Sequence, residues 1–307
     1  MTNDESVPAS DVWSQWLLHQ RHAGDSQFQQ TVIDAVDRYI DRVLDFAQLA
    51  AGETLADVGT GEGRVAFRAI ERAGPSLRVW MTDVSEAMLR HAEAQAVGRG
   101  VRGQCAFLRA SAERLEGLGA ESVDVVTTRS VLAYVPDKTA ALREFLRVLR
   151  PGGRISLAEP VFQDDAFAAR AMRAVIESKP PEGVSPLMTL LHRWKAAQFP
   201  DTEEKIRASA IANYCERDLI RFAQNAGFGD LHLELHIDTC PSLVRSWAVF
   251  VESSPHPLAP PLSVIMAEQF TSAEREFFER SMRPVVEDPK AVVTERMVYL
   301  TGRKPPA

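Results

Sequence analysis

The chain has 307 residues, and a typical domain size of about 150 residues predicts about two domains or one elaborated domain. Charged residues make up 25% of the chain and hydrophobic residues 45%, a balance that excludes wholesale disorder and a fibrous repeat. Lys and Arg number 35 against 42 Asp and Glu, which gives a formal net charge of −7. With no basic cluster to attract phosphates, we expect no nucleic-acid partner.

The sequence shows neither a membrane span nor a secretion signal. Its apolar runs, such as residues 247–251, are far shorter than the ~18 residues that a spanning helix needs, so we expect no membrane partner. Near the N-terminus, Asp4 and Glu5 stand where a signal peptide would carry Lys or Arg. We therefore expect a cytoplasmic protein.

Three cysteines, Cys105, Cys215 and Cys240, stand alone in the sequence. None is part of a C-x-x-C pair or has a histidine at metal-ligand spacing beside it, so we predict neither a disulfide framework nor a zinc site. His232 and His236 share one face of a predicted strand but lack a third ligand. The prediction is therefore no metal and three reduced structural thiols.

From residue 12 to residue 49, apolar side chains recur at helical spacing, which predicts an amphipathic helical segment. Two interpretations are open for the large apolar side chains at its start, a lid over a binding site or the packing face of another helix. We favour packing. These side chains are Trp13, Trp16, Leu17 and Phe28.

Residues 54–160 alternate short apolar runs with helical stretches. Strands and helices that alternate at this spacing predict a doubly wound, Rossmann-like α/β fold with a mostly parallel sheet and helices on both faces. The predicted strands are residues 54–58, 77–82, 105–109, 123–127 and 154–158, and the predicted helices are residues 66–72, 86–97 and 138–149.

Two helical inserts follow the fifth predicted strand, and prolines interrupt both. Between them lie a predicted helix at 216–226 and a strand at 231–239, and a last strand follows at 296–302. The predicted organisation is an N-terminal helical segment (1–50), a nucleotide-binding core (51–160), a helical cap insert (161–213), a core helix and strand (214–241), a second helical insert (242–293), and the last core strand with a tail (294–307).

The first predicted strand runs into a turn with glycine at every second position, Gly59, Gly61 and Gly63. Glycines there let the backbone approach a ligand at the carboxyl edge of the sheet, where open α/β folds bind nucleotides. A dinucleotide fingerprint, G-x-G-x-x-G, would need glycine at the position of Arg64. The acidic Asp57, two residues before the first glycine, also departs from that fingerprint.

This segment, from Asp57 to Gly63, resembles the first motif of class I S-adenosylmethionine-dependent methyltransferases, which reads acidic-x-G-x-G-x-G. Asp83, twenty residues past Gly63, ends the next predicted strand, where a carboxylate can accept both ribose hydroxyls. The resemblance implies S-adenosyl-L-methionine as the cofactor. The cofactor-binding residues it implies are Asp57, Gly59, Thr60, Gly61, Gly63, Asp83, Val84, Met88, Ser111, Ala112 and Thr128.

Residues 122–153 are similar to the fourth-strand region of the quinone-biosynthesis type of small-molecule methyltransferases. The resemblance covers about residues 50–160 and the terminal strand pair. It implies a seven-stranded sheet with an antiparallel last strand, and methyl transfer to a small-molecule substrate. The two inserts are expected to cap the ligand edge and to set the substrate. At the position of Ser111 the family commonly has an acidic residue that accepts a hydrogen bond from the adenine amino group. A neutral hydroxyl there makes a weaker hydrogen bond to the adenine.

Three residues are candidates for catalysis: Arg129 and Tyr134 after the fourth strand, and His192 in the first insert. Methyl transfer is an in-line displacement, so we expect placement and exclusion of water to supply most of the catalysis. Removal of the His192 side chain should then reduce the reaction rate less than removal of Arg129 or Tyr134. Tyr134 also has a plainer interpretation as a core aromatic residue, and His192 as a solvated helix residue.

Three other functions are open at this stage. A nicotinamide-dependent oxidoreductase is disfavoured by Arg64, and a catalytically silent S-adenosylmethionine-binding protein is left open by the neutral Ser111. Arsenite as the methyl acceptor would require the three cysteines to converge in space. The sequence specifies neither the acceptor atom nor the oligomeric state.

Overall fold

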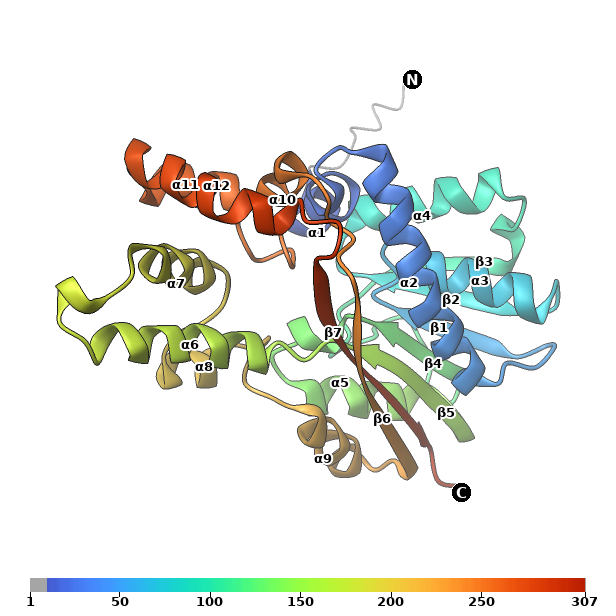
Figure 1. Cartoon of the computed structure of the whole chain (residues 1–307). Helices are drawn as coiled ribbons and strands as arrows, with labels where there is room; N and C mark the ends of the chain where they lie inside the picture. Colours follow the sequence, from blue (N-terminus) through green and yellow to red (C-terminus); the bar gives the residue numbers. More distant parts are fainter. Residues whose placement is uncertain (1–9, 307) are drawn as a thin grey trace, which may run out of the picture.

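The computed structural model describes residues 10–306, so the residues that bear on a secretion signal lie outside the described part of the chain. Seven strands form one sheet in the order β3-β2-β1-β4-β5-β7-β6 (Figure 1). Strands β1 to β5 are parallel, and β7 runs antiparallel to both of its neighbours, β5 and β6. This confirms the predicted sheet. The strands are β1 (Thr54–Val58), β2 (Arg78–Asp83), β3 (Cys105–Arg109), β4 (Val123–Arg129), β5 (Leu149–Glu159), β6 (Gly229–Pro241) and β7 (Val292–Arg303).

Helices cover both faces of the sheet. One apolar cluster joins α2 (Ser26–Ala47), α3 (Arg64–Ala73) and α4 (Glu86–Gly98) to the sheet, with Ile40, Phe67 and Ala92 fully or nearly fully buried in it. A second cluster packs α5 (Lys138–Val148) and α9 (Glu216–Ala226) against the sheet. The two clusters form the core of the domain.

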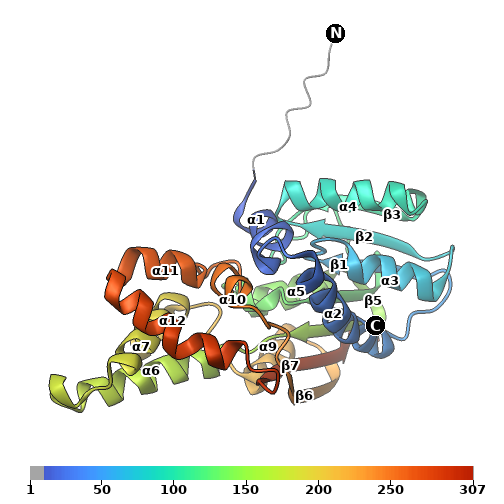
Figure 2. The same cartoon turned by 45° about the horizontal axis from the view of Figure 1, so that its top comes forward.

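The two inserts pack against each other as one cap, although the core residues 214–241 separate them in the sequence. Figures 1 and 2 both show this cap at one side of the sheet. Its apolar cluster combines Leu190 of the first insert with Trp247, Leu262 and Phe278 of the second. The cap helices are α6 (Gln163–Glu177), α7 (Pro186–Gln198), α8 (Glu203–Ala208), α10 (Trp247–Glu252), α11 (Leu262–Gln269) and α12 (Ser272–Val286).

The remaining short elements are α1 (Val12–Leu18) and four 3-10 turns, η1 (Gln20–His22), η2 (Arg102–Gln104), η3 (Leu132–Tyr134) and η4 (Pro181–Gly183). The carboxyl ends of β1, β2, β4 and β5 meet at one edge of the sheet, as parallel pairing requires. Among residues 10–306, no helix has the length and apolarity that a membrane span needs.

Candidate active site

A glycine-rich turn joins β1 to α3. Gly59, Gly61 and Gly63 have φ angles of 66°, 54° and 79°, in the left-handed region that favours glycine. A Cβ atom at position 59 would collide with the side chain of Val131, and one at position 63 would lie 2.5 Å from the Phe67 ring. The glycines therefore allow both the tight turn and the close approach of the loop that follows β4.

Asp57, in β1, stabilises this turn with its buried side chain. Its carboxylate is 1% exposed and accepts hydrogen bonds from the hydroxyls of Thr60, at 2.7 Å, and Thr127, at 2.9 Å. Burial raises the pKa of the Asp57 carboxyl to about 6, although the two hydrogen bonds lower it. The Thr60 amide donates to the Thr82 carbonyl at 2.9 Å, which ties the turn to the end of β2. Asp57 and Thr60 thus shape the turn without lining the cavity above it.

Asp83, the last residue of β2, connects the turn to the start of α4. Its carboxylate accepts hydrogen bonds from the amides of Gly61 and Ser85, both at 2.9 Å. Burial raises the pKa of the Asp83 carboxyl above its usual value. A carboxylate has about four acceptor positions, so Asp83 can accept further hydrogen bonds from a ligand in the cavity that it lines.

The loop after β4 is held by a buried acid, Glu159, at the end of β5. Its carboxylate accepts a hydrogen bond of 2.6 Å from the Thr128 hydroxyl and one of 2.9 Å from the Val131 amide. These contacts fix the loop that carries Arg129 and Tyr134, both of which line the cavity. Thr128 itself is fully buried and acts on the loop through Glu159.

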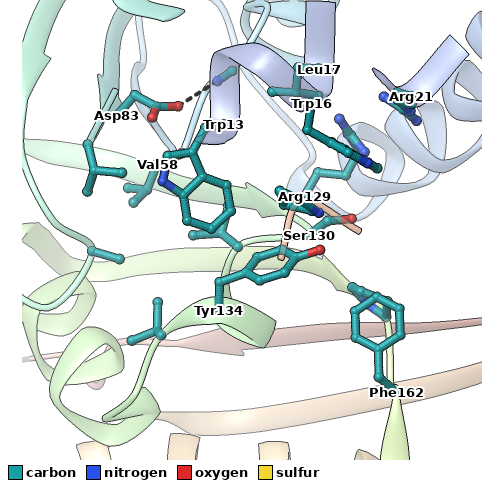
Figure 3. Close-up of a pocket in the computed structure, with 18 of the residues that line it drawn as sticks. Trp13, Trp16, Leu17, Arg21, Val58, Asp83, Arg129, Ser130, Tyr134 and Phe162 are labelled. Atoms are coloured by element: carbon teal, nitrogen blue, oxygen red, sulfur yellow. Dashed lines mark hydrogen bonds between the residues drawn. The ribbon is translucent and has the colours of Figure 1, made fainter. Parts of the chain in front are cut away.

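A cavity of about 470 Å³ opens at this edge of the sheet, a size within the range of small-molecule sites. Figure 3 shows Asp83 on one side of it and Arg21 on the other, with Arg129 and Tyr134 between them. Most of its wall is apolar or aromatic. The wall includes Trp13, Trp16, Leu17, Val58, Gly59, Gly61, Val84, Ala110, Ser111, Ala112, Glu113, Ser130, Val131, Pro160, Phe162, Ser254, Pro255 and Pro257.

The N-terminal segment covers this cavity. The Trp13 ring contacts the Tyr134 ring edge to face, with ring centroids 5.1 Å apart. The Trp16 indole donates a hydrogen bond of 3.0 Å to the Ser254 hydroxyl, which joins α1 to the proline-rich loop of the second insert. The favoured prediction, that Trp13, Trp16 and Leu17 are only a packing face, is therefore wrong, because all three line the cavity.

Comparison with known proteins fits this geometry. A methyltransferase domain model matches residues 56–157. The chain is 36% identical over 148 residues to nocamycin O-methyltransferase from Saccharothrix syringae, which covers 47% of this chain and 52% of that protein. It is 32% identical over 126 residues to aklanonic acid methyltransferase from Streptomyces sp. strain C5, covering 41% and 56%. Residues 56–157 of this chain therefore form a methyltransferase domain. The chain spans about half the length of the curated relatives it matches.

Solved structures share the fold of this methyltransferase domain and of its flanking helices. YcgJ from Bacillus subtilis has a TM-score of 0.56 at 15% identity and covers 88% of this chain and 100% of its own. The [4+2]-cyclase SpnF has a TM-score of 0.50 at 19% identity, covering 89% and 82%. At these identities the likeness shows the fold alone.

The methyltransferase family uses S-adenosylmethionine as its methyl donor, and the residues present fit that cofactor. The glycine turn leaves room for a ligand at the backbone, and the Asp83 carboxylate is held by two amides beside it. Of the predicted cofactor residues, six line the cavity: Gly59, Gly61, Asp83, Val84, Ser111 and Ala112. Asp57, Thr60, Gly63 and Thr128 lie behind this wall and shape it.

Met88 and His192 do not reach the cavity of the methyltransferase domain. Met88, in the first turn of α4, is fully buried, and the preceding Val84 is exposed and lines the cavity instead. His192 lies on α7 in the cap, where its Nε2 is 3.1 Å from the Asp201 carboxylate. The expectation that His192 stands at the ligand edge is corrected, because the cap helices pack to the side of the sheet.

The expected role of the inserts is corrected in part. They contribute Phe162 and the loop residues Ser254, Pro255 and Pro257 to the wall, while the N-terminal segment supplies the larger cover. Sequence reasoning missed Arg21, whose only signal was its place just after the aromatic run of α1.

The cysteines do not converge, because Cys105 and Cys240 lie on β3 and β6, the two edge strands of the sheet. This placement removes the structural basis for arsenite as acceptor. Within the described part of the chain, no group of three or more His, Cys, Asp or Glu residues has a metal-binding arrangement.

Proposed function

We propose that this protein transfers a methyl group from S-adenosylmethionine to a small-molecule acceptor. The observation that carries the proposal is the continuity of one cavity from Asp83 and the glycine turn, past Arg129, to an aromatic chamber under α1. A donor and an acceptor can therefore lie in one continuous cavity, and holding two reactants in line is the main demand of this reaction.

The Asp83 side of the cavity has the chemistry of the donor site. The free acceptor positions of the Asp83 carboxylate suit ribose hydroxyls, and the backbone at Gly59 and Gly61 is open to a ligand. Val84 and Ser111 offer an apolar face and a hydroxyl to the adenine on the neighbouring wall. When bound, S-adenosylmethionine supplies a methyl group on a cationic sulfur, and the electrons of the broken carbon–sulfur bond stay on that sulfur.

The other side has the chemistry of an acceptor site. Trp13, Tyr134 and Phe162 make an aromatic wall that excludes water. Burial raises the pKa of the Tyr134 phenol well above its usual range, so at neutral pH its hydroxyl donates a hydrogen bond and does not act as a base. The Arg129 charge favours an anionic form of the acceptor, whose proton leaves to solvent.

The similar proteins support a small organic acceptor, since two are named for nocamycin and aklanonic acid. Others are named as ubiquinone and menaquinone C-methyltransferases, so the names cover both O- and C-methylation and leave the acceptor atom open. A cytoplasmic location, the lack of nucleic-acid binding and the segment boundaries of the chain stay predictions.

Calorimetry with S-adenosylhomocysteine and with NADH tests the donor site. We expect S-adenosylhomocysteine to bind and NADH not to bind, and the reverse result would favour the oxidoreductase alternative. Because the [4+2]-cyclase SpnF shares the fold, binding alone is not enough. Methyl-labelled S-adenosylmethionine, incubated with a panel of phenols, enols and carboxylic acids, should pass label to an organic product. Binding without label transfer to any acceptor would indicate a silent binding protein.

A further inference from the structure

Two arginines from distant parts of the chain face the cavity, Arg21 of η1 and Arg129 at the end of β4 (Figure 3). Both side chains are partly buried, and both line the wall. Among residues 10–306, neither guanidinium forms an ion pair or a hydrogen bond with a carboxylate. By contrast, the neighbouring Arg64 is paired with Asp37.

The surroundings of these two arginines compensate their charges only in part. Burial and, to a smaller extent, the charge of Arg129 together lower the pKa of Arg21 to about 10. The charge of Glu62 raises the pKa of both arginines, but its carboxylate lies beyond ion-pair distance of either guanidinium. The Arg21 guanidinium rests over the Trp16 ring, 5.3 Å from its centroid, which compensates a charge only partly. Buried, unpaired charge is costly, so the site favours an anion that completes it.

Arg129 faces further charges on its inner side. Burial lowers the pKa of Arg129, while the charges of Asp57 and Glu159 oppose this shift. Both acids are already occupied by hydroxyl and amide donors of the loops described above. Neither carboxylate therefore pairs with Arg129, so its guanidinium can still bind a ligand anion at the cavity wall.

Arg21 lies on the opposite side of the cavity from Asp83, within reach of the charges of Glu62 and Arg64 beside the glycine turn. In Figure 3 Arg21 lies across the cavity from Asp83, beside Trp16 and toward Phe162. The wall on that side is formed by Trp16, Leu17, Phe162 and the prolines of the second insert. A ligand there meets one strong charge at the edge of a mainly apolar surface.

We propose that the acceptor is a mainly apolar, aromatic molecule that carries a carboxylate, and that Arg21 binds that carboxylate. The inference rests on the proposed function and names its substrate class. The planar guanidinium suits a carboxylate because it can donate two parallel hydrogen bonds to it. The amino-acid part of S-adenosylmethionine carries a carboxylate as well. The cavity offers one guanidinium for each of these two carboxylates. Arg21 is assigned to the acceptor because it lies across the cavity from Asp83.

The test compares an acid with its neutral amide in the protein saturated with S-adenosylhomocysteine. The probes are 2-naphthoate and 2-naphthamide, and the readout is calorimetry. In the parent protein we expect 2-naphthoate to bind about ten- to a hundredfold more tightly, the range for hydrogen bonds to a charged group. Arg21→Gln should remove that preference and leave the affinity for S-adenosylhomocysteine within about threefold. The control Arg217→Gln, which changes the same charge at an exposed site, should leave the preference intact.

Equal affinities for the two probes in the parent protein, no naphthoate binding, or an unchanged preference in Arg21→Gln would overturn the inference. A loss of S-adenosylhomocysteine affinity in Arg21→Gln, with 5′-methylthioadenosine affinity unchanged, would assign Arg21 to the donor carboxylate and also overturn it. Failure of the parent protein to bind S-adenosylhomocysteine would instead contradict the proposed function. Thermal unfolding of both variants confirms that each is folded.

Discussion

The carboxylate of Asp83 accepts a hydrogen bond of 2.9 Å from the backbone amide of Gly61. This contact ties the end of β2 to the glycine turn after β1. A second hydrogen bond, from the Ser85 amide, ties the same carboxylate to the start of α4. One side chain therefore organises two loops of the donor site and keeps free acceptor positions for the ligand.

Asp83→Ala should weaken S-adenosylhomocysteine binding by about 1.5–3 kcal/mol, because hydrogen bonds to a charged group are lost. Calorimetry at fixed salt measures the change. Asp238→Ala is the matched control, since that acid is exposed on β6 and distant in the sheet from β2. Unchanged affinity in Asp83→Ala would contradict the site assignment.

Gly59→Ala should lower the free energy of unfolding by at least about 2 kcal/mol, because it combines left-handed backbone strain with a collision against Val131. Gly100→Ala has a similar φ angle, 72°, and open space at its Cβ, so it reports the strain alone. Urea unfolding of the two variants separates the two costs. Adding Val131→Ala to Gly59→Ala should recover the collision part. Equal losses in Gly59→Ala and Gly100→Ala would show that the close approach carries no cost.

The buried Asp57 carboxyl should give the protein a distinct pH dependence. Its folded-state pKa, about 6, lies above the usual value of 3.8, so the folded state binds the proton more strongly. The resulting stability is fully present below pH 3.8 and is lost as the pH rises through 6. The parent protein should therefore lose roughly 3 kcal/mol relative to Asp57→Asn over this interval. Urea unfolding of both proteins from pH 4 to pH 7 measures this, and parallel stability curves would refute it.

All four tyrosines should resist ionisation in the folded protein. Burial is the largest cause of the raised pKa in each; the pKa of Tyr299 rises to about 12, and those of Tyr39, Tyr134 and Tyr214 lie well above the usual value of 10. Raised pKa values stabilise the folded state below pH 10, and this stability is lost as tyrosine ionises at higher pH. Tyrosinate absorbance should appear together with the loss of far-ultraviolet circular dichroism. Ionisation near pH 10 with native circular dichroism would contradict the burial of these phenols.

His192→Ala should leave S-adenosylhomocysteine affinity unchanged and reduce the free energy of unfolding by about 1 kcal/mol, since it removes one hydrogen bond to Asp201. Asp201→Ala should cost more, because that nearly buried carboxylate also pairs with Lys205 and Arg173. Once an acceptor is identified, the rate in His192→Ala should fall by less than a hundredfold. A loss of several thousandfold, with the acidic limb of the pH profile gone, would identify His192 as a base.

Local sequence signals were enough for the sheet and for much of the donor wall. The run from Thr54 to Val58 and the glycines after it predict a strand and a turn, because buried strands and left-handed turns restrict which residues can stand there. Asp83 follows from the same logic, since parallel strands bring their carboxyl ends to one edge.

The acceptor side was decided by tertiary structure. Arg21 and Trp16 reach the cavity because α1 and η1 pack across the sheet edge, and the Trp16 contact with Ser254 joins segments 238 residues apart. Nothing local to Met88 or His192 shows which way the side chain turns, since helical spacing predicts an apolar face but not what that face packs against. The sequence by itself therefore determined the fold and the donor motif, whereas the acceptor wall depends on long-range packing between segments whose own patterns specify only helices.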